Sequence, residues 1–467
     1  MRPVIPVKTT LTVLTFAALL LVPQAFPSLK NYMSIEPKSA VAVVTFRAKP
    51  PAAEALIDPL ASPESLSQTL NKRLLAKAPR NLFDPAHVLD HFYAALLKGE
   101  GVHIIHYGDS PTTADLITAD ARALFQHEFG DGGMGFVLMA RPWAWYNHRG
   151  IEMSGSNWKI DVGSTSTVKD GLNGLGAVSF RGAPGAVSRW KVKTAHRSVE
   201  IAYLVESQGG TFSVEADGNP IGTGSSTVAA GERPLTPGYA SFDIPPGTSE
   251  IALKVTSGSV RFYGADFRKG IGVVYSSLGI NGANVTLLSN AFNEAHWAAE
   301  LRHYKPDLII VNYGTNESGF PDFVDTTWGR EMRKAVARLQ RAMPEASILL
   351  MSPMDRGAKG INGEIDTIPT MPRLVATESK IAADTGVAFF DTFEAMGGSG
   401  TMGRWYTSEP RLVGSDYIHP MPAGARIVGE LLFSALREGF NHFKLEQLKR
   451  NIVGQAENTG QEGSRQP

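Results

Sequence analysis

The chain has no cysteine among its 467 residues. Disulfide bonds, a thiolate nucleophile and cysteine-ligated zinc are therefore excluded. An excess of either charge is missing too, because 45 lysines and arginines balance 45 aspartates and glutamates. No net field favours nucleic acid or an anionic membrane surface. Binding partners must therefore be argued from a local site, and no nucleic acid is expected among them.

Several catalytic signatures are also missing. No His/Asp/Glu cluster has ligand spacing such as His-Glu-x-x-His, so no metal is expected. The glycine run at residues 130–135 lacks the lysine of a phosphate-binding loop, and we interpret it as a flexible turn near the site. The Gly-x-Ser-x-Gly elbow of α/β-hydrolases does not occur. We expect no cofactor.

The N-terminus has the order of an export signal. Arg2 and Lys8 precede an apolar run at residues 11–22, and no clean small-x-small cleavage site follows. Residues 1–26 are therefore predicted to be a signal peptide or an uncleaved N-terminal membrane anchor. Either outcome predicts a periplasmic or extracytoplasmic protein, secreted or anchored to the inner membrane.

Hydrophobic periodicity divides the rest of the chain. Residues 27–81 lack sustained periodicity and read as a linker. Residues 82–140 and 268–440 alternate strand-like and helix-like runs, which is typical of a parallel sheet with helices on both faces. Between them, residues 141–267 alternate apolar and polar side chains as half-buried antiparallel strands do, which predicts an inserted β-sandwich. Residues 441–467 form a polar tail that we expect to be disordered from about Gln455.

The expected elements follow from these patterns. Strands of the parallel sheet are predicted at 102–105, 272–275, 308–313, 348–351 and 387–390. Helices are predicted at 85–98, 113–128, 291–303, 328–341, 373–384 and 423–438. Strands of the insert are predicted at 190–193, 199–203, 211–215 and 251–255.

Ser110 is the candidate nucleophile. It follows the first strand-like run and Gly108, and it precedes a predicted helix, so it would lie at the carboxyl end of a strand. Ligands gather at that edge in open α/β sheets. On the Gly-Asp-Ser sequence alone, Asp109 or Ser110 could instead simply cap the helix.

Asp416 and His419 are the candidate partners of that serine. A serine hydroxyl needs a base to take its proton, and the base needs a third group to hold its tautomer. Of the eleven histidines, only His419 has an aspartate three residues before it on a loop bounded by glycine and proline. His106 lies in the first strand and is interpreted as a packed or substrate-side residue. The alternative for Asp416 is that it caps a turn.

Two further segments offer donors for an oxyanion. The backbone amide of Gly282 and the side-chain amide of Asn316 have the right chemistry, and each follows a strand-like run. Gly282 could be an ordinary turn glycine, and Gly279 is its rival for the role.

The sequence resembles the SGNH (GDSL-type) hydrolase family, whose four conserved blocks occur here in the family's order. They are Gly108-Asp109-Ser110, Gly282, Gly314-Thr315-Asn316 and Asp416-x-x-His419. The resemblance implies a flavodoxin-like α/β fold and a catalytic set of Ser110, Asp416 and His419. It also implies an oxyanion hole from Ser110, Gly282 and Asn316. It implies no metal and no other cofactor.

Within that family, the chain is similar to bacterial peptidoglycan O-acetyl esterases with an inserted carbohydrate-binding-like, jelly-roll-like module. The similarity lies in residues 112–115, an Asp-Gly-Gly-x-Gly-Phe turn at 131–136, the insert itself and Met396-Gly397-Gly398. Pro111 departs from the pattern, in which histidine, leucine or glutamine is expected. Proline removes a backbone donor beside Ser110, so it could reshape the acyl pocket.

The implied function is that of an extracytoplasmic serine esterase that removes O-acetyl groups from a bacterial glycan such as peptidoglycan. Its partner would be the acetylated polysaccharide or peptidoglycan, with possible anchoring in the inner membrane. Alternatives are an exopolysaccharide (for example cellulose) O-deacetylase or acetyltransferase of a secretion system, a glycan-binding scaffold with an idle hydrolase half, and a lysophospholipase or thioesterase. Aromatic residues at the start of the insert could stack on sugars, but we interpret most of them as core: Trp143, Trp145, Tyr146, Trp158 and Trp190.

Overall fold

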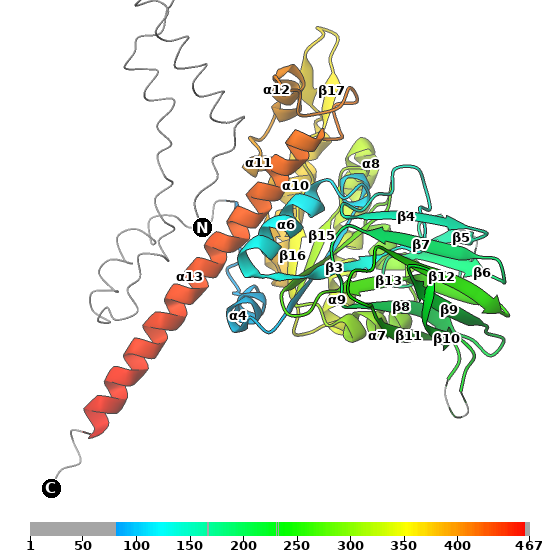
Figure 1. The fold of residues 1–467 in the computed structure, drawn as a ribbon. Coiled ribbons are helices and arrows are strands. Elements are labelled where there is room, and N and C mark those ends of the chain that lie inside the picture. The colour runs from blue at the N-terminus through cyan, green and yellow to red at the C-terminus, as the bar shows by residue number, and fades with distance from the viewer. Residues whose placement is uncertain (1–80, 166–167, 230, 232, 463–467) are drawn as a thin grey trace, which may run out of the picture. The chain divides into compact units, whose positions relative to one another are not determined.

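The computed structural model describes residues 81–462, apart from 166, 167, 230 and 232 (Figure 1). The predicted signal or anchor at 1–26 and the linker up to residue 80 lie outside the described residues. No described helix combines the length and the hydropathy that a bilayer span requires.

A mixed sheet of 12 strands forms the centre of the fold. Its hydrolase part consists of β1 (Leu82–Phe83), β2 (Val102–Gly108), β3 (Asp131–Val137), β14 (Val273–Gly279), β15 (Leu308–Asn312), β16 (Ser347–Met351) and β19 (Ala388–Phe390). The order β19-β16-β15-β2-β14-β3 is parallel throughout. Strand β1 adds an antiparallel edge beside β19. The predicted parallel sheet is therefore confirmed.

Apolar side chains of these strands alternate between two cores, as period-two geometry requires. Ile104 and Ile310 pack on one face against α4 (Asp90–Lys98), α6 (Ile117–Phe129) and α13 (Pro422–Glu462). Ile105 and Ile309 pack on the other face against α7 (Glu294–Tyr304), α9 (Gly329–Ala342) and α10 (Thr370–Thr385). Helices thus cover both faces, as the sequence predicted.

Helix α13 differs from the prediction. It begins close to the expected start but continues to Glu462, through residues that were expected to be a disordered polar tail from about Gln455. Phe440 and Phe443 on this helix contact the ring of Tyr93 in α4, and residues 444–450 are rich in lysine, glutamate, leucine and glutamine, which favour helix. Figure 1 shows α13 running beside α4 and α6.

The interpretation of residues 130–135 as a flexible turn was wrong, because most of them belong to strand β3. A Cβ atom at Gly132 would lie 2.7 Å from the carbonyl oxygen of Gly272, and one at Gly133 would lie 2.3 Å from that of Phe267. The glycines are therefore needed where β3 passes closely between two neighbouring backbones. The glycine-rich composition suggested a turn, but it reflects this close approach.

Antiparallel strands fill the segment between β3 and β14. They are β4 (Ile151–Ser156), β5 (Lys159–Val162), β6 (Val178–Gly182), β7 (Val187–Val192), β8 (Ser198–Val205), β9 (Thr211–Ala216), β10 (Asn219–Ser225), β11 (Thr236–Asp243), β12 (Glu250–Ser257) and β13 (Val260–Arg268). The central sheet continues beyond β3 with strands β13, β6, β5, β8 and β11. A second sheet has the strand order β10-β9-β12-β7-β4.

These strands share a core with the hydrolase part. Phe212 and Phe262 of the insert belong to the same cluster of buried residues as Ile105 and Ile309. The additional antiparallel sheets are consistent with an inserted domain, but its boundaries at residues 141 and 267 stay predictions.

The aromatic residues at the start of the insert behave mostly as interpreted. Trp190 and Tyr146 are buried, and Trp143 and Trp158 pack partly buried against the core. Trp145 is the exception, with 74% of its surface exposed.

Candidate active site

Three parallel strands end level with one another and bring the predicted blocks together. Gly108 at the end of β2 pairs with Gly279 of β14 and with Asn312 of β15. The candidate residues follow these ends by two to four positions: Ser110, Gly282 and Asn316. All three therefore lie at the carboxyl edge of the sheet, where α/β folds bind ligands.

Two glycines let the nucleophile helix sit tightly on the strand ends. Ser110 begins the short helix α5 (Ser110–Thr113), and Pro111 occupies a first-turn position where its missing N–H costs nothing. A Cβ atom at Gly108 would lie 2.2 Å from the Thr112 hydroxyl oxygen, and one at Gly279 would lie 2.1 Å from the Thr113 nitrogen. Gly279 is thus required for packing.

The three predicted catalytic side chains form a continuous chain of contacts. Ser110 Oγ lies 2.8 Å from His419 Nε2, and His419 Nδ1 lies 2.6 Å from Asp416 Oδ2. This order of hydroxyl, imidazole and carboxylate is the arrangement that activates a serine nucleophile. Ser110 and His419, which the fold brings into contact, are 309 positions apart in the sequence.

Asp416 also organises its own loop. Its Oδ1 atom accepts hydrogen bonds from the backbone N–H groups of Ile418 and His419 at 3.0 and 3.1 Å. Burial opposes ionisation of Asp416, but the bonds from the His419 ring and from these two amides outweigh it and lower the pKa of the carboxyl group. Asp416 therefore has both predicted roles: Oδ1 caps the turn, and Oδ2 orients the imidazole of His419.

The imidazole and its carboxylate are open to solvent. The side chains of His419 and Asp416 are 46% and 48% exposed. A bulky ester can therefore approach the histidine without a lid having to open.

Gly282 and Asn316 line one open hollow of about 920 Å³. Gly282 has a φ angle of +71°, and no atom lies within 4 Å of where its Cβ would be. The Asn316 Nδ2 atom donates one hydrogen bond to the carbonyl oxygen of Ala283 at 2.8 Å. That bond fixes the amide and leaves its second N–H for another acceptor.

Glu317 was not singled out from the sequence. This buried residue accepts hydrogen bonds from the N–H groups of Val285 at 2.8 Å and Gly314 at 3.1 Å, so it ties the Gly282 loop to the Asn316 loop. Burial raises the pKa of its carboxyl group to about 8. Its position directly after Asn316 was the only available signal, because sequence does not tell a buried carboxylate from an exposed one.

Asp109 is a second buried acid in this region. It is 1% exposed, and burial raises its pKa to about 6. Sequence reasoning considered it only as a helix cap, but its side chain makes no such bond to α5.

His106 does not join the site. It is fully buried, its Nδ1 atom lies 2.8 Å from the Tyr275 hydroxyl, and burial lowers its pKa to about 3. The packed interpretation fits this environment, in which the ring is neutral.

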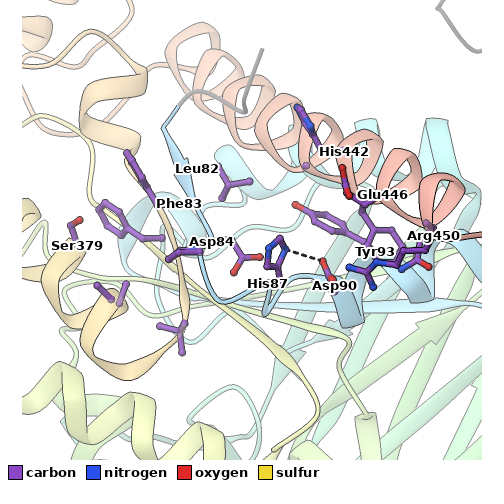
Figure 2. Close-up of a pocket in the computed structure, with 18 residues that line it drawn as sticks. Leu82, Phe83, Asp84, His87, Asp90, Tyr93, Ser379, His442, Glu446 and Arg450 are labelled. Atoms are coloured by element: carbon purple, nitrogen blue, oxygen red, sulfur yellow. Dashed lines mark ion pairs between the residues drawn. The ribbon is translucent and has the colours of Figure 1, made fainter. Parts of the chain in front are cut away.

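Figure 2 shows another pocket, of about 560 Å³, between β1, α4 and residues 439–450 of α13. Its wall is largely apolar and includes Leu82, Phe83 and Tyr93, with a His87–Asp90 ion pair at 3.9 Å. None of the predicted site residues lines it. Within the described residues, no group of three or more histidines and acids is placed to hold a metal ion.

Comparisons with known proteins bear on this site. Residues 248–427 match the model of the GDSL-like lipase/acylhydrolase family. A solved structure described as "Peptidoglycan O-acetylesterase in action" is similar with a TM-score of 0.64 and 22% identity, over 77% of this chain and 99% of that one. At that identity, the likeness shows the fold alone.

Two other solved structures are more distant. A family two carbohydrate esterase from Clostridium thermocellum, in complex with cellohexaose, has 12% identity and a TM-score of 0.26, over 61% of this chain and 99% of that one. A putative GDSL-like lipase from Parabacteroides merdae has 17% identity and a TM-score of 0.27, over 36% of this chain and 73% of that one. No curated protein matches the sequence.

Proposed function

We propose that this ester-hydrolysing enzyme of the SGNH type, whose residues 248–427 match the GDSL-like lipase/acylhydrolase family model, removes O-acetyl groups from an acetylated bacterial glycan, peptidoglycan first among them. The observation that carries this proposal is the unbroken contact chain from Ser110 through His419 to Asp416. The peptidoglycan O-acetylesterase whose fold this chain shares supports the choice of glycan.

The proposed reaction begins at the hydroxyl group of Ser110. His419 Nε2 takes the proton of Ser110 as Oγ attacks the acetyl carbonyl, while Asp416 holds the imidazole and stabilises its charge. The amides of Ser110 and Gly282 and the free N–H of Asn316 are the proposed donors to the oxyanion.

The rest of the reaction has two stages, formation of an acetyl-serine and its hydrolysis. The sugar hydroxyl leaves with the proton from His419, and an acetyl-serine remains on Ser110. Water then attacks that ester with His419 again acting as base, which releases acetate and restores the hydroxyl. Every proton in this scheme passes through one imidazole.

The test uses the Ser110→Ala variant of the purified protein. We expect hydrolysis of 4-nitrophenyl acetate to fall by about 10⁴-fold or more, because the nucleophile is removed. The control is Ser207→Ala, an exposed serine of the insert. Retained turnover in Ser110→Ala would contradict the assignment.

The glycan is tested separately. Acetate release from O-acetylated peptidoglycan should exceed release from acetylated cellulose at equal ester content. The opposite preference would instead support an exopolysaccharide deacetylase.

The proposed location is periplasmic, with the N-terminus as a cleaved signal or an inner-membrane anchor. The basic residues and apolar run before residue 23 support it. Fractionation of cells expressing the full chain, with the N-terminus of the mature protein sequenced, would separate the two forms. Recovery only in the cytoplasm would contradict both.

A further inference from the structure

Arg356 lies between two loops of the candidate active site. It follows β16 at the carboxyl edge of the sheet, and its Nη1 atom donates to the Thr315 carbonyl oxygen at 2.8 Å and to Ser318 Oγ at 3.3 Å. The next residue, Gly357, donates its N–H to the carbonyl oxygen of Tyr417 at 2.9 Å. Arg356 is thus held beside both the Asn316 loop and the Asp416 loop.

The guanidinium group of Arg356 has no acidic partner. It is half-buried and makes no ion pair with any residue that the structure describes. Burial lowers the pKa of Arg356, and the carboxylate that opposes this effect is Asp416, which is already bonded to His419. A partly desolvated cation without a counter-ion is unfavourable unless a ligand supplies the charge.

The surroundings of Arg356 suit a sugar. It lines the same hollow as Gly282 and Asn316, whose volume of about 920 Å³ lies within the range of ligand sites. Phe320, which is 66% exposed, adds a flat apolar face to the wall. The acids in the wall are Asp322, which is exposed, and Glu317, which is buried and bonded to two backbone amides.

We propose that Arg356 binds a carboxylate on the substrate, so that the enzyme prefers acetyl esters on anionic glycans to those on neutral ones. This proposal rests on the esterase function proposed above. Only Nη1 is used by the described residues, so Nη2 and Nε remain to form the paired hydrogen bonds that guanidinium groups make with carboxylates. A carboxyl group on the acetylated sugar, or on a substituent next to it, would be the ligand.

The experiment compares two small esters that differ only in that group, mono-O-acetylated methyl glucuronide and mono-O-acetylated methyl glucoside. The measured quantity is the ratio of kcat/KM for the glucuronide to kcat/KM for the glucoside. For the native protein we expect a ratio of about 10 to 100, the range of a charge-assisted hydrogen-bonded pair. Raising the salt concentration should raise KM for the glucuronide.

Two variants and a matched control locate the effect. Arg356→Met should bring the ratio close to one and abolish the salt dependence, and Arg356→Lys should keep part of both, because lysine retains the charge but not the fork. Lys359→Met removes an exposed cation three residues away, outside the hollow, and should leave the native ratio. Thermal unfolding of each variant checks that it is folded.

Two outcomes would overturn the proposal alone. One is a ratio near one in a native protein that hydrolyses both esters. The other is an Arg356→Met variant that loses kcat equally on both esters, because Arg356 would then only hold the Thr315 loop in place. A native protein that hydrolyses neither these esters nor 4-nitrophenyl acetate would overturn the esterase function together with this proposal.

Discussion

Strand β3 has a parallel neighbour on one side, β14, and an antiparallel neighbour on the other, β13. On the β14 side, consecutive strands run the same way, so their carboxyl ends meet at one edge and bring Ser110, Gly282 and Asn316 together. On the β13 side, neighbouring strands alternate in direction, and their connections are shared between both edges. None of the proposed catalytic residues comes from that side.

The two sides also differ in what their polar groups do. Around the candidate active site, carboxylates such as Asp109 and Glu317 are buried next to backbone amides and the nucleophile. On the antiparallel side, charged residues pair with opposite charges. Some pairs are partly exposed and contribute little to stability, such as Arg181–Glu206 and Lys254–Glu215, and in others one partner is buried, as in Arg268–Asp266. The proposed catalytic residues lie on the parallel side only, whereas both sides contribute to the hydrophobic core. Four predictions test this division.

The largest expected effect is on the parallel side. Asp416→Asn should lower kcat on 4-nitrophenyl acetate by about 10⁴-fold, because an asparagine stabilises the wrong tautomer of His419. The melting temperature should change little, because the side chain is about half exposed. Asp366→Asn, an exposed residue of β18 (Ile365–Thr367), is the control. A loss of less than tenfold would mean that Asp416 does not orient the base.

The converse experiment truncates the antiparallel side. Trp190→Ala should lower the free energy of unfolding by about 3–5 kcal/mol, because a fully buried tryptophan leaves a cavity. The kcat of the remaining folded enzyme should not change. Trp145→Ala, which removes an exposed ring, should alter stability by less than about 0.5 kcal/mol. Denaturant unfolding should be a single transition, because both sides share one core; two separate transitions would show that the insert folds independently.

Asn316→Ala tests the oxyanion donor. We expect kcat to fall by about 10²–10³-fold with KM nearly unchanged, since the bond would be made only in the transition state. The control is Asn362→Ala, an exposed asparagine on the connection between β17 (Gly357–Lys359) and β18. An equal effect on KM would point instead to ground-state binding by Asn316.

The smallest expected effect concerns pH. The pKa of Glu317 is raised from 4.5 to about 8 in the folded protein, so the folded state keeps a proton that the unfolded state loses. The associated stability is fully present below pH 4.5 and is lost as pH rises towards 8. From about pH 5.5 to about pH 7, this group alone should cost about 2 kcal/mol of unfolding free energy.

Glu317→Gln should remove that part of the pH slope, measured by urea unfolding at a series of pH values. Glu345→Gln, an exposed carboxylate after α9, should keep the native slope. An unchanged slope in Glu317→Gln would mean that Glu317 ionises in the folded protein as it does in the unfolded chain.

The prediction from sequence succeeded where the signal was local. Apolar runs that end in glycine correctly placed β2, β14 and β15, and the polar residues just after those runs were the candidate site. The family resemblance favoured Gly282 over Gly279, but the residues alone gave no physical reason for that choice. The structure gives one, because a Cβ atom at Gly279 would collide with α5, while Gly282 faces open space. Glu317 and Arg356 were missed for a related reason, since their roles depend on burial and on partners from other loops.

Two errors also have a physical cause. The glycines of β3 were read as turn residues because local composition does not reveal that two other backbones pass within a few ångströms. The prediction of disorder from about Gln455 was wrong because it rested on polar composition, which does not by itself exclude a helix, and α13 continues to Glu462.

The exposure of His419 and Asp416 affects what happens after the first half of the reaction. An acetyl group carried on Ser110 at an uncovered surface meets bulk water at a concentration that no dissolved alcohol can match. Enzymes that hand an acyl group to a second sugar must keep water away from that intermediate. The exposure of the imidazole therefore favours, for the acetyl-serine proposed above, release of acetate to water over transfer to a second sugar.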